Sequence, residues 1–204
     1  MSNPAYQAAR AEKSREKIVQ AALALFVERG YDAVALKDIA TAAAVSTATL
    51  FKHFPEKDQL ITGATALLAE LRDEGSAQSD VEPVLEDALK TIGQSYARRL
   101  DHPMLIGLAR LGVSLGGRVP GLGAAVNEAW RKPFAVRLQT VLERGITDGK
   151  LVIPDMTVAT QQFFGLMTDA LLWRRLLSLG GAADSGYRNT VVAEAVKTFL
   201  ARYS

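Results

Sequence analysis

The chain has 204 residues, of which 49% are hydrophobic and 23% are charged, a composition typical of a folded globular protein. It contains no cysteine and only two histidines, which excludes disulfide scaffolds, thiolate nucleophiles, Cys-ligated metal centres and a multi-histidine metal site. No uncharged apolar run approaches the roughly 20 residues of a membrane-spanning helix, and the N-terminus lacks the apolar core of a secretory signal, so we expect a cytoplasmic protein with no membrane partner.

The formal net charge of +2 is concentrated at the N-terminal end of the chain. Residues 1–57 carry eight basic and six acidic side chains, whereas residues 58–204 carry equal numbers of each. A small positive excess of this kind permits a polyanionic partner such as nucleic acid, but it does not by itself identify one.

Apolar side chains in the first part of the chain recur at the spacing of an amphipathic helix. Ile18, Ala22 and Phe26 fall on one stripe, and Gly30 stands where a C-terminal glycine would end that helix. Downstream, the pattern predicts two short helices and a long one, which cover Lys37–Ala43, Thr47–Phe54 and Lys57 to near Gly75. The small and polar run Gly75–Val81 is the best candidate for a domain boundary.

The second half of the chain has the same helical pattern. The expected helices cover Glu82–Leu100, Pro103–Gly116, Leu122–Ile146, Pro154–Leu179 and Tyr187–Tyr203. Pro133 lies inside the third of these and should kink or interrupt it. No alternating strand pattern is present, so we predict an all-α fold of about nine helices. We divide the chain into an N-terminal three-helix helix-turn-helix domain (1–57), a connecting helix (58–75) and a larger C-terminal helical domain (76–204).

The stretch Leu36–Leu60 predicts two short helices that cross at a steep angle. Ala40 is small enough to let the second helix cross closely, and Ser46 can cap that helix by accepting a hydrogen bond from a backbone N–H. Leu50 and Phe54, four residues apart, face inward. A short helix braced in this way fits the major groove of B-DNA, which is about 12 Å wide.

The outward face of the second helix carries residue types that suit contact with DNA. Thr47 and Thr49 lie in the first turn, where backbone N–H groups also point at an anion, and nearby lysines supply charge for phosphates. Because one copy has few basic residues, we expect two copies on adjacent half-sites about one helical turn apart. The alternative is a purely structural helical hairpin. The predicted DNA-binding residues are Lys37, Ser46, Thr47, Ala48, Thr49, Lys52, His53 and Lys57.

The run Ile18–Leu60, in which FVERGYDAVALKDIA is followed by AAVSTATLFKHFPEKDQL, resembles the N-terminal domain of TetR family transcriptional regulators. The resemblance implies a homodimer that binds a near-palindromic double-stranded DNA operator, and a C-terminal domain that binds a small-molecule effector and thereby lowers operator affinity. We interpret Phe51 as a packing residue. The chain departs from the family pattern at Ala35, where Thr is common, at Ala44 and Ala48, where Gly is usual or frequent, and at Phe51, where Tyr is usual.

The apolar residues of the C-terminal domain admit two interpretations, a plain core or the lining of an effector pocket. A pocket needs apolar walls and a few polar groups that orient the ligand, and the residue types present favour an apolar or aromatic effector. The candidate ligand-binding residues are Tyr96, Met104, Asn127, Trp130, Phe134, Phe163 and Met167.

The last two predicted helices are unusually apolar, and the first of them leaves little polar face, which indicates burial. The family resemblance implies that two helices from each chain form a four-helix dimer interface. The alternative is that these helices are buried within one chain. The candidate interface residues are Leu172, Trp173, Leu176, Val192, Val196, Phe199 and Leu200.

Catalytic motifs are absent from the sequence: it has no glycine-rich phosphate loop, no GxSxG elbow and no HExxH motif. We therefore expect no enzyme, no metal and no cofactor, and Asp169 is the one candidate for a buried carboxylate. The prediction is a dimeric, ligand-responsive transcriptional regulator, a repressor released from its operator by a small apolar or aromatic effector. The alternatives are an effector-independent dimeric DNA-binding regulator and a small-molecule-binding protein with a vestigial helix-turn-helix.

Overall fold

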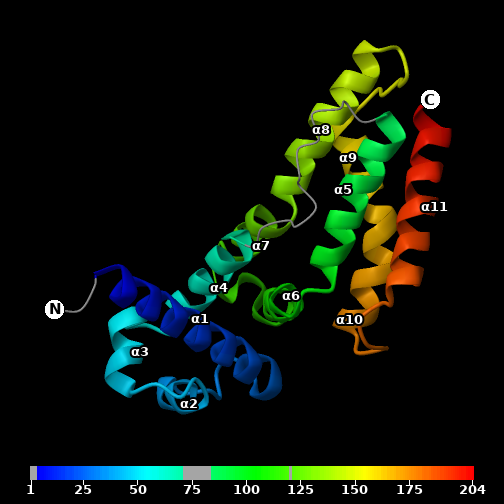
Figure 1. The fold of residues 1–204 in the computed structure, drawn as a ribbon. Helices are drawn as coiled ribbons and strands as arrows, with labels where there is room; N and C mark the ends of the chain where they lie inside the picture. Colours follow the sequence, from blue (N-terminus) through cyan, green and yellow to red (C-terminus); the bar gives the residue numbers. More distant parts are fainter. Residues whose placement is uncertain (1–3, 71–83, 120) are drawn as a thin grey trace. The chain divides into compact units, whose positions relative to one another are not determined.

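A computed structural model describes residues 4–70, 84–119 and 121–204 of the chain. These residues form helices and no strand, which confirms the predicted all-α fold (Figure 1). Not one of the described helices combines the length and the hydrophobicity needed to cross a membrane. The predicted boundary at 75–81 and the final turn of the predicted connecting helix lie outside the described residues.

The chain folds as two compact units. The first combines residues 1–71 with 107–129, and the second combines residues 72–106 with 130–204. Residues 107–129, which the sequence grouped with the C-terminal domain, therefore pack with the N-terminal helices.

The first unit is built on its long N-terminal helix, whose apolar stripe of Ile18, Ala22 and Phe26 is buried as predicted. This helix contacts the three helices that follow it. It ends at Arg29, and Gly30 adopts a φ of +84°, which an L side chain would resist. The elements of the unit are α1 (Pro4–Arg29), α2 (Leu36–Ala42), α3 (Thr47–His53), α4 (Asp58–Glu70), most of α6 (Pro103–Leu115), the 3-10 turn η1 (Gly116–Arg118) and nearly all of α7 (Leu122–Trp130).

The turn between α2 and α3 contains an alanine in the left-handed region. Ala44 has a φ of +53°, and its N–H donates to the Thr41 carbonyl while the N–H of Val45 donates to that of Ala40. A non-glycine residue in this conformation is strained by about 1 kcal/mol or more. The absence of the family's usual glycine therefore weakens the turn without changing its course.

The second unit is arranged around α5, which contacts α8, α9 and α11. Figure 1 shows α5, α9 and α11 side by side. Gly93 permits the close approach of α5 to α11, because a Cβ at this position would lie 2.9 Å from Val192. The elements of the unit are α5 (Leu85–Leu100), the start of α6, α8 (Lys132–Thr147), α9 (Met156–Thr168), a π-helical segment (Asp169–Trp173), α10 (Arg174–Leu176) and α11 (Ser185–Tyr203).

The predicted helix Leu122–Ile146 is interrupted, as Pro133 indicated. Helix α7 ends at Trp130, and α8 begins at Lys132 with Pro133 in its first turn. A proline is tolerated there because the first-turn N–H groups of a helix have no partner within the helix. The interruption falls where the chain passes from one compact unit to the other.

Candidate DNA-binding and effector sites

Helix α3 begins with a side-chain cap that the sequence predicted. The Oγ of Ser46 accepts a hydrogen bond from the Thr49 N–H at 3.0 Å, and the two hydroxyl oxygens lie 2.7 Å apart. Such a cap replaces one of the missing backbone partners at a helix start and typically contributes about 1 kcal/mol. Ser46 therefore stabilises the start of α3, and its hydroxyl is also hydrogen-bonded to the Thr49 hydroxyl.

The inner face of α3 is held by apolar contacts. Leu50 is fully buried and Phe54, at the C-terminal end of the helix, is 3% exposed, as the four-residue spacing predicted. Gly63 of α4 lies against the Phe54 ring, because a Cβ there would be 2.8 Å from the ring edge. These contacts fix the position of α3 on α1 and α4 from behind.

The outer face of α3 is free of packing within the unit. Thr47 and Lys52 are exposed as predicted, and Ala48 is exposed as well, whereas Thr49 and His53, which were also predicted to face outward, are half-buried. Phe51 is 47% exposed, so its interpretation as a packing residue is wrong. It lies one turn after Thr47, on the outward face, and that spacing was the signal that could have placed it there. An exposed phenyl ring on this face can contact thymine methyl groups.

The two lysines that flank the helix pair differ in their surroundings. Lys37, in the first turn of α2, is exposed and available to a phosphate. Lys57, placed with the phosphate contacts by the sequence, is turned into the protein instead. Its Nζ donates to the Tyr31 carbonyl oxygen and lies 4.4 Å from the Tyr31 ring centre and 5.5 Å from that of Phe26. Lys57 therefore ties the start of α4 to the end of α1.

Electrostatics around Lys57 agree with this inward position. Burial lowers the pKa of Lys57, although the carboxylates of Asp32 and Asp58 act in the opposite direction. The Tyr31 hydroxyl donates to Asp58, and burial followed by this hydrogen bond raises the pKa of Tyr31. The exposed Asp32 accepts from Arg118 of η1 at 2.9 Å. The group joins three segments of the first unit, and sequence patterns gave no signal for it because its members are far apart in the chain.

Aromatic side chains gather in the core of the second unit. Tyr96 of α5 lies 4.4 Å from Phe164, 5.5 Å from Phe134 and 6.3 Å from Trp130, measured between ring centres. Phe163 contacts Phe164 edge-on at 5.5 Å. The structure thus brings together four of the predicted ligand-binding residues and adds Phe164, which the sequence analysis left out although it neighbours Phe163.

Among the polar atoms of this aromatic cluster, some have hydrogen-bond partners and one has none among the described atoms. The Tyr96 hydroxyl lies 3.0 Å from the Thr168 hydroxyl, which donates in turn to the Phe164 carbonyl at 2.8 Å. Burial raises the pKa of Tyr96, although the hydrogen bond with Thr168 and the charge of Arg131 act in the opposite direction. The buried Nε1 of Trp130 has no hydrogen-bond partner among the described atoms. A buried donor of this kind can serve a ligand acceptor.

The three remaining predicted ligand residues are placed differently. Met167 is buried beside Gly93 in the second unit, with its sulfur 3.4 Å from the position that a Cβ would occupy. Met104 is buried at the start of α6. Asn127 is exposed on α7 and belongs to the first unit.

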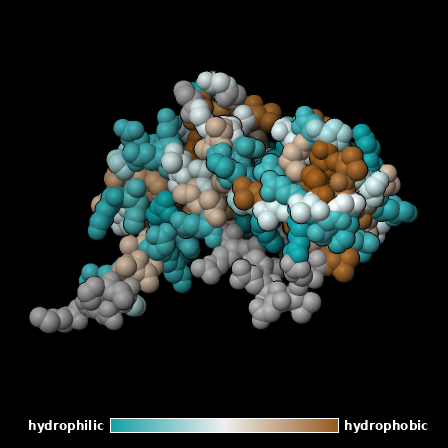
Figure 2. Space-filling view, turned by 90° about the horizontal axis from the view of Figure 1, so that it is seen from above, coloured by the Kyte–Doolittle hydropathy of each residue, from teal (hydrophilic) through white to brown (hydrophobic). Residues whose placement is uncertain are grey.

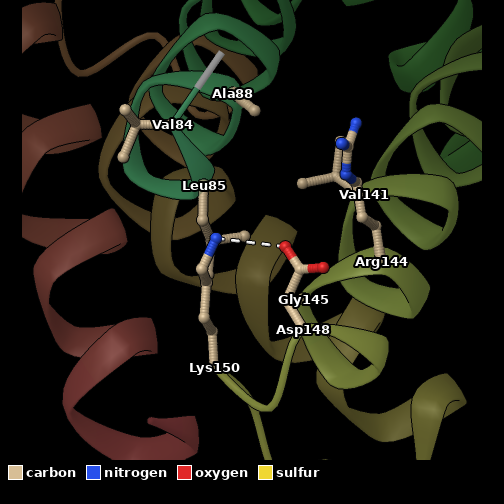
Figure 3. Close-up of a pocket in the computed structure, with 8 residues that line it drawn as sticks. All are labelled: Val84, Leu85, Ala88, Val141, Arg144, Gly145, Asp148 and Lys150. Atoms are coloured by element: carbon tan, nitrogen blue, oxygen red, sulfur yellow. Dashed lines mark hydrogen bonds and ion pairs between the residues drawn. The ribbon is translucent and has the colours of Figure 1, made fainter. Parts of the chain in front are cut away.

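A cavity of about 270 Å³ opens between the start of α5 and the end of α8 (Figure 3). Its wall is partly apolar, and its charged side carries Lys150, whose Nζ donates to Asp148 at 3.0 Å. The two walls come from segments far apart in the chain, so no sequence pattern indicated the cavity. The lining residues are Val84, Leu85, Ala88, Val141, Arg144, Gly145, Asp148 and Lys150.

Most of the predicted dimer-interface residues are buried within the protomer. Leu172, Val192, Val196 and Phe199 are at most 4% exposed, and Phe199 contacts Phe163 edge-on at 5.3 Å. The protomer's own core accounts for these four residues, because α11 packs on α5 and α9, and the π-helical segment that carries Leu172 packs on α5. Leu176 and Leu200 are half-buried.

Trp173, in contrast, is 49% exposed at the end of the π-helical segment. Val158 and Leu166 of α9 and Leu177, which follows α10, are also large apolar side chains that are exposed. Asp169 is also exposed, so the prediction that it is a buried carboxylate is wrong. Hydrophobic side chains reach the surface elsewhere as well, as patches separated by hydrophilic ones (Figure 2).

A capped helix with a polar outer face, braced by two others and joined to a helical unit with an aromatic core, defines a helix-turn-helix DNA-binding protein. Comparison with known families agrees. Residues 18–64 match the model of bacterial regulatory proteins of the tetR family, and residues 87–204 match that of the C-terminal domain of AefR-like transcriptional repressors. The chain belongs to the TetR family of transcriptional regulators.

Individual relatives are moderately similar to this chain. The uncharacterized HTH-type transcriptional regulator YvkB of Bacillus subtilis (strain 168) is 36% identical over 90 residues, which are 44% of this chain and 46% of YvkB. The match thus spans about half the length of this curated relative. A TetR transcriptional regulator from Agrobacterium tumefaciens is 29% identical, with a TM-score of 0.73 and coverage of 93% of this chain and 94% of its own. The flavonoid-responsive regulator FrrA is 26% identical, with a TM-score of 0.64 and coverage of 95% and 98%.

Proposed function

We propose that this chain is a ligand-responsive transcriptional repressor that binds a DNA operator as a homodimer. The observation that carries the proposal is the outer face of α3, which is exposed while the opposite face is locked into the unit by Leu50 and Phe54. A short rigid helix with a polar surface is the shape that the major groove accepts.

The DNA contacts follow from the exposure of each side chain. Thr47, in the first turn, and Lys52, in the last turn, present a hydroxyl and a charge on the exposed side of α3 that would enter the groove. Phe51 lies between them on the same face and supplies an apolar contact. Lys37 binds a phosphate from the neighbouring helix, which positions the protein and carries no sequence information.

We assign dimerisation to the exposed apolar side chains of α9, the π-helical segment and the end of α10. Val158, Leu166, Trp173 and Leu177 are large and exposed, and exposed apolar surface of this kind marks protein–protein contacts. Tryptophan is also enriched among the residues that dominate interface energy. Two copies joined in this way would present two α3 helices to a palindromic operator, which raises affinity above that of one copy.

We assign effector binding to the aromatic cluster around Tyr96. Its rings and the unpartnered Nε1 of Trp130 suit a flat, apolar molecule that carries a hydrogen-bond acceptor. FrrA, one of the structural relatives, is by name flavonoid-responsive. We infer that such a ligand acts by population shift, because it can move the equilibrium between two conformers only by its different affinity for each.

The close packing of that cluster favours a second candidate, a regulator with no effector. Tyr96, Phe134, Phe163 and Phe164 are at most 2% exposed and contact one another, as residues of an ordinary core do. In this alternative the second unit serves dimerisation alone.

DNA binding is tested by selecting duplexes from a random library with the intact protein and measuring affinity by fluorescence anisotropy. The double variant Thr47→Ala/Lys52→Ala should lose most operator affinity. The control Lys90→Ala/Thr91→Ala changes the same residue types on α5 and should bind normally. If the α3 variant binds as tightly as the wild type, the assignment of α3 as the recognition helix is wrong.

Effector binding is tested on the same protein by thermal shift with a panel of flavonoids and other planar aromatic compounds. A ligand should raise the melting temperature and release the selected duplex. If no compound in the panel does either, the effector-independent candidate is the better description.

A further inference from the structure

A second cavity of the second unit lies between α5 and α11, and it shares no lining residue with the cavity between α5 and α8. The two helices pack closely where Gly93 faces Val192. Beyond this contact, toward the end of α5 and the start of α11, a space of about 170 Å³ remains between polar side chains. That volume is many times the roughly 10–15 Å³ that one water molecule requires. The lining residues are Gln94 and Arg98 of α5 and Ser185, Arg188 and Asn189 of α11.

Hydrogen-bond donors dominate the wall of this cavity. Each guanidinium carries five N–H donors and no acceptor, and the amides and the hydroxyl can donate as well. Carboxylates are absent from the described residues that line it. Gln94 and Arg98 are one turn apart on α5, and Ser185 and Asn189 are one turn apart on α11, so each helix presents its polar groups from one face. A wall of this kind matches a ligand that is rich in acceptors.

Arg188 is held in position by an acid that is almost buried. Its Nη1 donates to Oδ2 of Asp101 at 3.1 Å, and the side chain of Asp101 is only 9% exposed. Asp101 is the C-cap of α5, so the ion pair joins the two helices that form the cavity. This bond uses one of the five N–H donors of the guanidinium and fixes its orientation before a ligand binds.

Arg98 adds a second positive charge from the α5 side. Its Nη2 donates to the neutral hydroxyl of Ser95 at 3.1 Å, a bond that orients the guanidinium without neutralising it. The single charge of Asp101 is shared, because Oδ1 of Asp101 also lies 3.8 Å from Nε of Arg175. Asp184, the N-cap of α11, is the second acid at this end of the unit. The three guanidiniums exceed these two carboxylates by one charge, which favours an anionic ligand.

We propose that this cavity, which we call the α5–α11 anion site, binds a phosphate group through the guanidiniums of Arg98 and Arg188. Arginine suits this task because its planar fork can donate two parallel N–H bonds to one phosphate. The hydroxyl of Ser185 and the amide of Asn189 supply further donors. The phosphate comes either from inorganic phosphate or from a small phosphate monoester, which share a tetrahedral group of oxygen acceptors.

The α5–α11 anion site goes beyond the proposed function. It requires no DNA, and none of its lining residues belongs to the aromatic cluster to which we assign the effector. Because its donors come from both helices, a bound phosphate would connect the end of α5 to the start of α11. We therefore expect phosphate to stabilise the folded second unit.

The test is isothermal titration calorimetry of the intact protein with inorganic phosphate at constant ionic strength, which keeps the screening of charges the same throughout. The wild type should bind phosphate with a Kd of about 1 mM or lower, and its melting temperature should rise with phosphate concentration. Methyl phosphate and acetate are titrated in the same way. Methyl phosphate tests for a monoester, and acetate tests whether any small anion is accepted.

Two variants locate the binding on opposite walls of the cavity. Arg98→Gln removes one guanidinium and should weaken phosphate binding about tenfold or more, because charge-assisted hydrogen bonds are the strongest contacts of the site. Asn189→Ala removes a neutral donor and should have a smaller effect of the same sign. Both side chains are exposed, so both variants should fold. Arg188 is left unchanged because its loss would remove an ion-pair partner of Asp101.

The matched control is Arg202→Gln, which makes the same change in the last turn of α11 as Arg98→Gln makes in the last turn of α5. The Arg202 guanidinium lies 5.0 Å from the centre of the Tyr203 ring and does not line the cavity. The control should keep the wild-type affinity for phosphate. Circular dichroism of each variant confirms that it is folded.

The outcomes decide between the site and its alternatives. The proposal is overturned if the wild type binds no phosphate, if Arg98→Gln binds it as tightly as the wild type, or if Arg202→Gln loses as much affinity. Acetate bound as tightly as phosphate would overturn the assignment to a phosphate group. Methyl phosphate bound at least as tightly as phosphate supports a monoester, and weaker binding supports the inorganic ion. DNA enters none of these measurements, so a failure of the proposed function leaves them valid.

Discussion

The outer face of α3 and the aromatic cluster around Tyr96 show two different relations between sequence and function. On α3 the side chains proposed to contact DNA are exposed, so helix phase alone separates Thr47 and Lys52 from the buried Leu50. In the cluster, the candidate functional residues are themselves the core. Exposure therefore selects the candidate DNA contacts in the first region, whereas in the second region the same aromatic residues serve stability and are also the candidates for ligand contact.

The largest expected difference between the two regions is in stability. Phe163→Ala removes a fully buried ring from the core and should lower the free energy of unfolding by about 3–5 kcal/mol. Phe51→Ala removes an exposed ring and should change it by about 0.5 kcal/mol at most. Urea unfolding followed by circular dichroism measures both. Similar losses for the two variants would mean that α3 packs against something in solution.

Lys52 on α3 and Lys57, directly before α4, sharpen the comparison within one unit. Lys57→Gln removes the contact with the Tyr31 ring and carbonyl and should lower stability by about 1–2 kcal/mol. Lys52→Gln, on the exposed face, should leave stability unchanged and reduce the salt slope of operator binding by about 0.9 per protomer. If Lys57→Gln instead changed only the salt slope of operator binding and not stability, Lys57 would be a phosphate contact.

The turn that presents α3 should gain stability from a glycine. Ala44→Gly relieves the left-handed strain at φ +53° but gives the unfolded chain more freedom, so we expect a net gain of about 0.5–1 kcal/mol. Thermal denaturation at fixed pH measures it. A loss of stability would show that the alanine is not strained here. Ala42→Gly, at the end of α2, is a control that should be destabilising.

The smallest expected effect concerns pH and His102 in the second unit. Its Nδ1 accepts a hydrogen bond from the Met104 N–H at 3.2 Å and so caps α6 in the neutral form. Burial, aided by the guanidinium of Arg99, lowers the pKa of His102. The unfolded chain therefore binds the proton more readily, and this contribution to stability is present above about pH 6.5 and lost as the pH falls through the lowered pKa.

The measurement compares melting temperatures at pH 7.5 and 5.5. Between pH 7.5 and 5.5, the melting temperature of the wild type should fall by more than that of His102→Asn. Asparagine can still cap the helix but does not titrate. An equal loss in both proteins would remove His102 from the pH response.

Local patterns predicted most of the helix boundaries closely. The predicted Lys37–Ala43 and Thr47–Phe54 became Leu36–Ala42 and Thr47–His53. These predictions succeeded because periodicity, a capping serine and the placement of glycine and proline act over one or two turns, within reach of a sequence pattern.

The errors concern side chains whose surroundings come from distant segments. Lys57 was predicted to face phosphates, but it is held by Phe26 of α1 and by Tyr31, which follows α1. Val192 and Phe199 were predicted to meet a partner, but they are buried against the protomer's own α5 and α9. Apolarity predicts that such a residue is buried, but not by which neighbour.

By itself, the sequence determined that the described part of the chain is helical without strands, most of the helix boundaries, and that Leu50 and Phe54 form the inner side of α3. Backbone geometry and helix phase are set by residues a few positions apart. The tertiary structure alone decided that Lys57 turns inward, that Trp173 rather than Val196 reaches the surface, and that residues 107–129 pack with the N-terminal helices. Those outcomes depend on packing between segments distant in the chain, where many apolar partners are chemically equivalent and only shape selects among them.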